Sequence, residues 1–123
     1  MHRVMVVEDD PDMRRLVSIT LSIDPDLEVC GDASSAAEAV TQARSLAPDV
    51  VIMDYFIEGE VMGIDAANMI KSAAPDVRVL LFTSHDLATD AERTSGIDGY
   101  VQKDNLIELV PAIQRLVGQA PPQ

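Results

Sequence analysis

The chain has 123 residues, of which 47% are apolar and only 3% aromatic, and it carries a net charge of −12. Its length fits one domain with an aliphatic core, since domains commonly run to about 100–150 residues. The acidity argues against nucleic acid and anionic membranes as partners, because binding phosphates requires clustered Lys and Arg.

The sequence contains no apolar run near the roughly 20 residues of a membrane span, and its start lacks the pattern of a signal peptide. The single Cys30 can form neither an internal disulfide nor a zinc site by itself. We therefore expect no membrane association and a cytoplasmic location.

The first elements are a buried strand over residues 3–7 (RVMVV) and a helix that follows it. Asp10 is the predicted N-cap of this helix and Pro11 its first residue, a position where the missing N–H of proline costs nothing. Apolar residues then recur at helical spacing until Pro25, which ends the pattern.

The rest of the chain continues this alternation. Ser35 and Glu38 have the spacing of a capping box at a helix start. Further strands are predicted over residues 27–33, 50–53, 77–82 and 98–101, and further helices over residues 35–46, 64–74, 87–94 and 108–118. Pro111 requires the last helix to begin near Glu108 or to kink, because proline fits only the first turn. Its apolar face is formed by Leu109, Val110, Ile113, Leu116 and Val117.

Strands that alternate with helices predict an α/β domain with a parallel sheet, and near-continuous apolar strands predict that helices cover both faces. In such sheets the ligand site lies at the carboxyl ends of the strands. Polar residues follow several predicted strands at that end, namely Glu8, Asp9, Asp10, Asp54, Thr83, Ser84 and Lys103.

Clustered carboxylates repel one another unless a cation joins them, and carboxylate oxygens with waters suit Mg²⁺. An aspartate can attack phosphorus to form an aspartyl phosphate, and a lysine supplies a compact positive charge for a phosphoryl oxygen. These residue types at one sheet edge would therefore permit phosphoryl transfer to an aspartate, with Mg²⁺ as cofactor.

Four motifs carry a resemblance to a known family: VMVVEDD (Val4–Asp10), PDVVIMDY (Pro48–Tyr55), LLFTS (Leu80–Ser84) and DGYVQKD (Asp98–Asp104). In this order the sequence resembles the receiver domain of two-component response regulators over nearly its whole length. The resemblance implies a flavodoxin-like three-layer sandwich with strand order 2-1-3-4-5. Residues 1–118 would form the receiver, and residues 119–123 a flexible tail or the start of a linker.

The resemblance implies a role for each matching residue. Asp54 would be the phosphoacceptor, and Lys103 would pair with it and later contact a phosphoryl oxygen. Asp9, Asp54 and the backbone carbonyl of Phe56 would bind Mg²⁺, with Glu8 acting mainly through a metal-bound water.

Signalling roles are implied as well. Thr83 would hydrogen-bond the phosphoryl group, and Tyr100 would change rotamer in step with it. The partner would be a sensor histidine kinase or a histidine phosphotransfer protein. A homodimer would use the face of the fourth helix, fifth strand and fifth helix, and no small-molecule turnover is expected.

The sequence departs from the family pattern in three places. Gly63 lies further from Asp54 than usual, and Glu58 stands where a proline is common. The stretch between Thr83 and Lys103 is short, which affects the predicted fourth helix. Asp104 follows Lys103 in place of proline, as in the branch usually linked to helix-turn-helix output domains. Bulky Phe56 would shield an acyl phosphate from water and lengthen its life.

Alternatives remain open at this point. Asp10 and Thr83 fit simple capping roles, Lys103 a surface position, and Tyr100 a static, half-buried ring. The altered loop around Glu58 keeps a pseudo-receiver, a binding module that is never phosphorylated, as the alternative function. A phosphohydrolase of the haloacid-dehalogenase type is disfavoured, because Phe56 occupies the place of its general acid.

Overall fold

Every predicted β-rich run forms a strand in the structure, a computed structural model that describes residues 2–54, 63–84 and 97–118. The strands pair in parallel in the order β2-β1-β3-β4-β5, which confirms the predicted topology. Their bounds are β1 (His2–Val7), β2 (Leu27–Ala33), β3 (Val50–Met53), β4 (Arg78–Thr83) and β5 (Gly99–Gln102).

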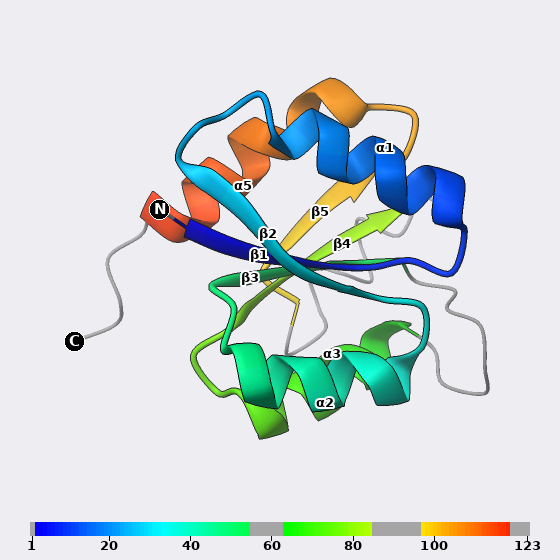
Figure 1. Ribbon diagram of the computed structural model, residues 1–123, viewed down its shortest axis with the longest axis vertical. Helices are drawn as coiled ribbons and strands as arrows, with labels where there is room; N and C mark the ends of the chain where they lie inside the picture. The colour runs from blue at the N-terminus through cyan, green and yellow to red at the C-terminus, as the bar shows by residue number, and fades with distance from the viewer. Residues whose placement is uncertain (1, 55–62, 85–96, 119–123) are drawn as a thin grey trace.

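Helices cover both faces of this sheet (Figure 1). On one face lie α1 (Pro11–Leu21) and α5 (Leu109–Gly118), with the short 3₁₀ helix η1 (Leu106–Glu108) leading into α5. On the other lie α2 (Ala36–Leu46) and α3 (Gly63–Ala73). The result is the predicted three-layer flavodoxin-like sandwich; the predicted helix at residues 87–94 falls outside the described residues.

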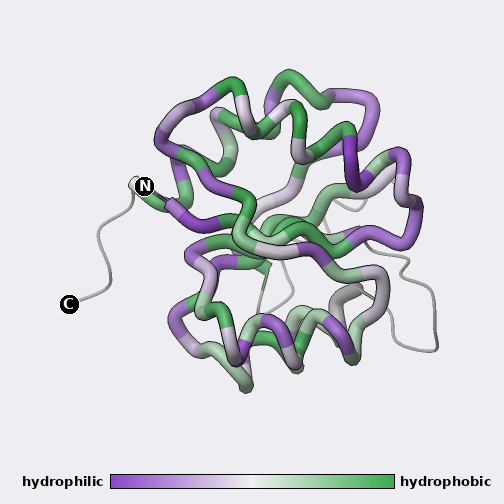
Figure 2. Tube along the Cα trace, viewed as in Figure 1, coloured by the Kyte–Doolittle hydropathy of each residue, from purple (hydrophilic) through white to green (hydrophobic). Residues whose placement is uncertain are grey.

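The core consists of two aliphatic clusters, one on each side of the sheet. Successive strand residues point to opposite faces, so Val4 and Val6 join the α1–α5 side while Met5 and Val7 join the α2–α3 side. Figure 2 shows the hydrophobic segments concentrated in the central strands. Both faces are thus buried, which leaves the strand ends as the natural places for polar chemistry.

The helix starts follow the predicted capping chemistry, with one difference. The side chain of Asp10 accepts a hydrogen bond from the Asp12 N–H (3.0 Å), and Ser35 Oγ accepts one from the Glu38 N–H (3.3 Å). The Glu38 carboxylate, however, accepts from the Ser34 N–H (3.4 Å) and not from that of Ser35, so the capping box is incomplete. Asp10 nevertheless fixes the point at which the chain turns from β1 into α1.

Some element boundaries differ from the predicted ones by about one residue. β4 and β5 each begin and end one residue later than expected, so Thr83 is the last residue of β4 and does not follow it. Pro111 lies in the first turn of α5, which begins at Leu109, and this confirms the predicted start near Glu108. None of the helices within the described ranges is sufficiently long and apolar to cross a membrane.

Candidate functional site

Three backbone hydrogen bonds extend the strand ladders just past their ends and fix the residues that carry the chemistry. The Glu8 N–H donates to the Ala33 carbonyl (2.9 Å), and the Asp54 N–H donates to the Val7 carbonyl (3.4 Å). The Lys103 N–H donates to the Thr83 carbonyl (2.9 Å). Because the strands are parallel, Glu8, Asp54 and Lys103 meet at one edge of the sheet, as the sequence predicted.

Lys103 bridges two carboxylates at this edge. Its Nζ lies 2.7 Å from Glu8 Oε1 and 2.7 Å from Asp54 Oδ2. The side chains of Lys103, Glu8 and Asp54 are only 17%, 5% and 11% exposed. Water screens charges weakly at such burial, so these ion pairs interact more strongly than surface pairs do.

The protonation equilibria reflect this crowding. Burial raises the pKa of Glu8 to about 7, with the neighbouring Asp54 carboxylate adding to the rise and Lys103 opposing it. Burial alone would lower the pKa of Lys103, but its hydrogen bonds to Asp54 and Glu8 outweigh this and hold it above the ordinary value. Lys103 therefore stays charged at neutral pH. Its single positive charge cannot neutralise the three carboxylates of Glu8, Asp9 and Asp54.

The donor set fits a hard divalent cation. One carboxylate oxygen each from Glu8, Asp9 and Asp54 lies within 4.8 Å of the others. Glu8 Oε2 is buried, and among the described residues no group donates a hydrogen bond to it. Mg²⁺ prefers such oxygen ligands and keeps several waters, so these residues would hold it. The carbonyl of Phe56, predicted as a further ligand, lies outside the described residues.

Thr83 and Tyr100 occupy neighbouring strands near this edge. Thr83 is fully buried at the end of β4, and the β4–β5 register pairs Leu81 with Tyr100. Paired residues of parallel strands share a face, so Thr83 and Tyr100 point to the same side of the sheet as Leu81. Tyr100 is half-buried against the α2–α3 cluster. Thr83 and Tyr100 thus share a face of the sheet, and their predicted action as a coupled pair stays a prediction.

One contact at the site was missed by the sequence analysis. Arg14 Nη1 on α1 donates a hydrogen bond to the backbone carbonyl of Glu8 (2.7 Å). A helical side chain points back toward its helix N-terminus, so a basic residue in the second turn after Asp10 can reach the end of β1. That spacing is the signal from which the contact could have been predicted.

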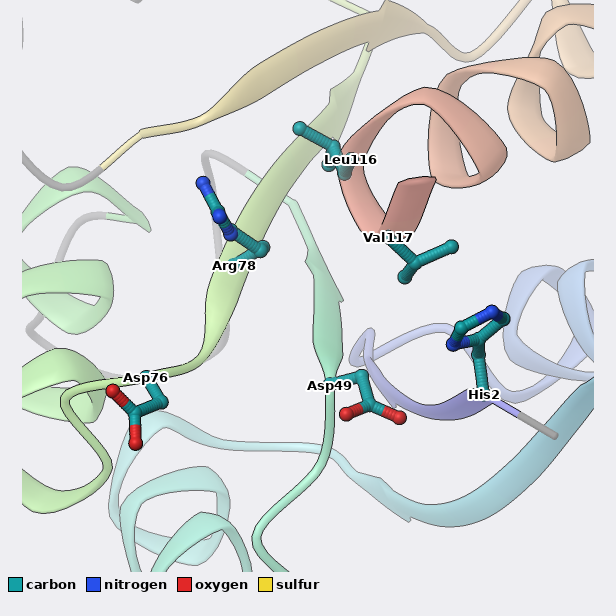
Figure 3. Close-up of a pocket in the computed structure, with 6 residues that line it drawn as sticks. All are labelled: His2, Asp49, Asp76, Arg78, Leu116 and Val117. Carbon is teal, nitrogen blue, oxygen red and sulfur yellow. The ribbon is translucent and has the colours of Figure 1, made fainter. Parts of the chain in front are cut away.

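The opposite edge of the sheet contains a surface pocket of about 200 Å³. Figure 3 shows its lining, which comes from the strand starts and the end of α5: His2, Asp49, Asp76, Arg78, Leu116 and Val117. None of these residues belongs to the predicted site, which forms at the carboxyl ends of the strands.

Comparison with known proteins agrees with this geometry. The family model of the response regulator receiver domain matches residues 4–114. The chain belongs to this family. The four motifs thus identified the family correctly.

Two response regulators are similar to this chain in sequence. A nitrate/nitrite response regulator protein homolog of Haemophilus influenzae is 33% identical over 104 residues, and the response regulator protein VraR of Staphylococcus aureus is 34% identical over 103 residues. These matches cover 83% and 82% of this receiver but 50% and 49% of the relatives, so the chain spans about half their length.

Solved structures show the same fold. A two-component response regulator of the LuxR family from Aurantimonas superposes with a TM-score of 0.87 at 34% identity, covering 97% of this chain and 87% of the other. The response regulator domain of Thermotoga maritima CheB superposes with a TM-score of 0.86 at 27% identity, covering 98% and 99%. The LuxR-family match agrees with the branch inferred from Asp104.

Proposed function

We propose that this receiver accepts a phosphoryl group on Asp54 from a phosphohistidine of a sensor kinase or phosphotransfer protein, in a Mg²⁺-dependent reaction. The observation that supports this most is the bridge of Lys103 between Glu8 and Asp54 at 2.7 Å each, beside a carboxylate cluster within 4.8 Å. A structural ion pair would need one carboxylate. The third acid favours a bound cation, as does the Glu8 oxygen that accepts no hydrogen bond among the described residues.

The proposed step transfers a phosphoryl group from the nitrogen of the donor histidine to a carboxylate oxygen of Asp54. A carboxylate oxygen of Asp54 attacks the phosphorus, a P–O bond forms, and the P–N bond to the donor histidine breaks. The imidazole leaves with the electron pair of that bond and takes a proton from solvent. The products are an acyl phosphate on Asp54 and a neutral histidine.

The residues around Asp54 then stabilise the transferred charge. Bound Mg²⁺ would supply Lewis-acid stabilisation of the phosphoryl oxygens. Lys103 is positioned to exchange one carboxylate contact for a phosphoryl oxygen, because its ammonium already lies against Asp54. Thr83 would donate its hydroxyl hydrogen to the same group.

Phosphorylation would shift an existing two-state equilibrium of the domain. Thr83 and Tyr100 would link the site to the face of β5 and α5, together with the helix predicted at residues 87–94. That face would serve for homodimerisation or effector control. The role is that of a cytoplasmic signalling switch, with self-phosphorylation and slow self-dephosphorylation but no turnover of small phosphoesters.

Mass spectrometry after exposure to acetyl phosphate tests this function. With Mg²⁺ the wild type should gain one phosphoryl group that hydroxylamine removes, and it should gain none in EDTA. Asp54→Asn should gain none under either condition. Asp76→Asn, which changes an exposed aspartate at the opposite sheet edge, should behave as the wild type does. A wild type without an adduct would support the pseudo-receiver instead.

A further inference from the structure

The backbone of Glu8 is held on both sides, although Glu8 lies just past the end of β1. Its N–H donates to the Ala33 carbonyl of β2 (2.9 Å), and its carbonyl accepts from Arg14 Nη1 (2.7 Å). The Glu8 carbonyl belongs to the peptide unit that leads into Asp9. A hydrogen bond to this carbonyl therefore restrains the Glu8–Asp9 peptide plane, which contains the Cα atom that carries the Asp9 side chain.

Arg14 is itself well anchored. Its N–H donates to the Asp10 carbonyl (2.9 Å) in the first turn of α1, and Asp10 is the N-cap that fixes where this helix begins. A hydrogen bond from a guanidinium to a carbonyl is charge-assisted and stronger than a neutral one. The end of β1 and the start of α1 are thus joined by one side chain, which binds the backbone of a residue of the acidic cluster.

We propose that Arg14 is a positioning residue for the acidic site: through the Glu8 carbonyl it orients the carboxylates of Glu8 and Asp9 for Mg²⁺. The expected consequence for phosphorylation rests on the proposed function. The effect of Arg14 on Mg²⁺ binding does not, and it is tested separately. Arg14 touches no reacting atom; it acts through the peptide that carries two of the three acidic side chains.

The direction in which Mg²⁺ affinity changes when Arg14 is removed distinguishes this positioning role from a purely Coulombic effect. Arg14 is a positive charge near carboxylates that attract Mg²⁺, so its removal would strengthen cation binding if only Coulomb interactions mattered. Loss of positioning predicts the opposite, a weaker site. The neighbouring Arg15 is exposed on the same helix, and its side chain makes no hydrogen bond or ion pair within the described ranges. It is therefore a matched control for the change in charge.

Isothermal titration calorimetry with MgCl₂ on the whole chain is the direct test. We expect Arg14→Gln to raise the Mg²⁺ Kd by about tenfold, as for other residues that orient metal ligands from outside. Arg14→Lys, which keeps a charged donor, should recover part of the affinity. Arg15→Gln should leave the Kd unchanged or lower it. Arg14 lines a surface pocket with Arg15 and Ser18, so the shorter side chain leaves no buried void.

Phosphorylation from acetyl phosphate supplies a second readout. Arg14→Gln should be slow at low Mg²⁺ and should approach the wild-type rate at saturating Mg²⁺, since the metal then restores the arrangement. A fold defect would lower the rate at every Mg²⁺ concentration and would alter the circular dichroism spectrum. That result would overturn the inference.

Other outcomes are equally decisive. An unchanged or lower Kd in Arg14→Gln would overturn the positioning role, as would equal losses in Arg14→Gln and Arg15→Gln. A wild type that binds no Mg²⁺ would overturn the inference along with the metal site. A wild type that binds Mg²⁺ tightly but never gains a phosphoryl group would overturn the proposed function alone, and the comparison of Kd values would still decide on Arg14.

Discussion

Lys103 has the clearest individual role, because two buried carboxylates share it. The side chains of Glu8 and Asp54 are 5% and 11% exposed, and a carboxylate oxygen of each lies 2.7 Å from the ammonium. Removing one partner of a buried ion pair leaves an uncompensated charge, which costs more than the pair itself contributes. Without Lys103, two buried carboxylates would lose their compensating charge together.

Substitution Lys103→Met should therefore destabilise the metal-free protein at neutral pH. We expect the free energy of unfolding to fall by roughly 2 kcal/mol or more, below the cost for fully buried pairs because these side chains keep some solvent contact. Mg²⁺ should restore more stability to this variant than to the wild type. Urea unfolding followed by circular dichroism, in EDTA and in MgCl₂, measures both effects.

The second lysine of the chain provides the control. Lys71 Nζ lies 2.6 Å from Asp98 Oδ2, but the two side chains are 26% and 21% exposed. Lys71→Met should cost less than about 1 kcal/mol and should respond to Mg²⁺ as the wild type does. Equal losses and equal Mg²⁺ responses in the two lysine variants would show that the Lys103 bridge is an ordinary surface pair.

The acidic edge could be predicted at the residue scale because topology alone places it. Once strands are parallel, residues after their ends must meet, and Glu8, Asp9, Asp54 and Lys103 do. The second partner of Lys103 was not predicted, since reach between side chains depends on their exact geometry. The contact of Arg14 was missed because a helical arginine has many solvated positions open to it, so the spacing from Asp10 indicates that Arg14 can reach the Glu8 carbonyl but does not select that position over the others.

At the scale of elements, β5 has little free space at Gly99, where the Leu80 side chain of β4 lies against it. A Cβ added there would lie 2.7 Å from Leu80 Cδ1 and 3.5 Å from Leu116 Cδ1. Leu80 and Leu116 are buried, at 0% and 5% exposed, so the methyl groups have little room to retreat. Gly99 thus leaves space for the Leu80 side chain, which a larger residue at this position would displace.

We expect Gly99→Ala to lower the free energy of unfolding by about 1–2 kcal/mol, the lower range for overpacking, because a leucine rotamer change absorbs part of the clash. Gly118→Ala is the matched control, since nothing lies within 4 Å of an added Cβ there. It should stay within about 0.5 kcal/mol of the wild type. Thermal or urea unfolding decides, and a Gly99→Ala variant as stable as the wild type would contradict the close packing.

Element types were easier to predict than element ends. Runs such as VVIM at Val50–Met53 are apolar throughout and flanked by turn residues, so their type follows from composition. The ends of β4 and β5 shifted by one residue because ladder hydrogen bonds, and not side-chain polarity, determine where a strand stops. Thr83 illustrates this, since a polar residue at a sheet end can still lie within the strand.

For the whole molecule, the net charge of −12 sets the electrostatic background. Self-repulsion among acids destabilises the folded state, and any salt relieves part of it by screening. A specific cation site adds a term that screening cannot supply, because a ligand bound only to the folded state stabilises it by RT ln(1 + [L]/Kd). The two contributions separate when MgCl₂ is compared with NaCl of equal ionic strength.

The acidic cluster predicts a reversal of stability order in one variant. Asp9→Asn removes one of three crowded carboxylates, so in EDTA the variant should be at least as stable as the wild type. In MgCl₂ the wild type should gain about 2.7 kcal/mol at a hundredfold excess over its Kd, and the variant much less. Unfolding followed by circular dichroism suits a chain without Trp. If the difference in unfolding free energy between the variant and the wild type is the same in EDTA and in MgCl₂, Mg²⁺ only screens charge. Diffuse screening cannot distinguish one aspartate from the rest.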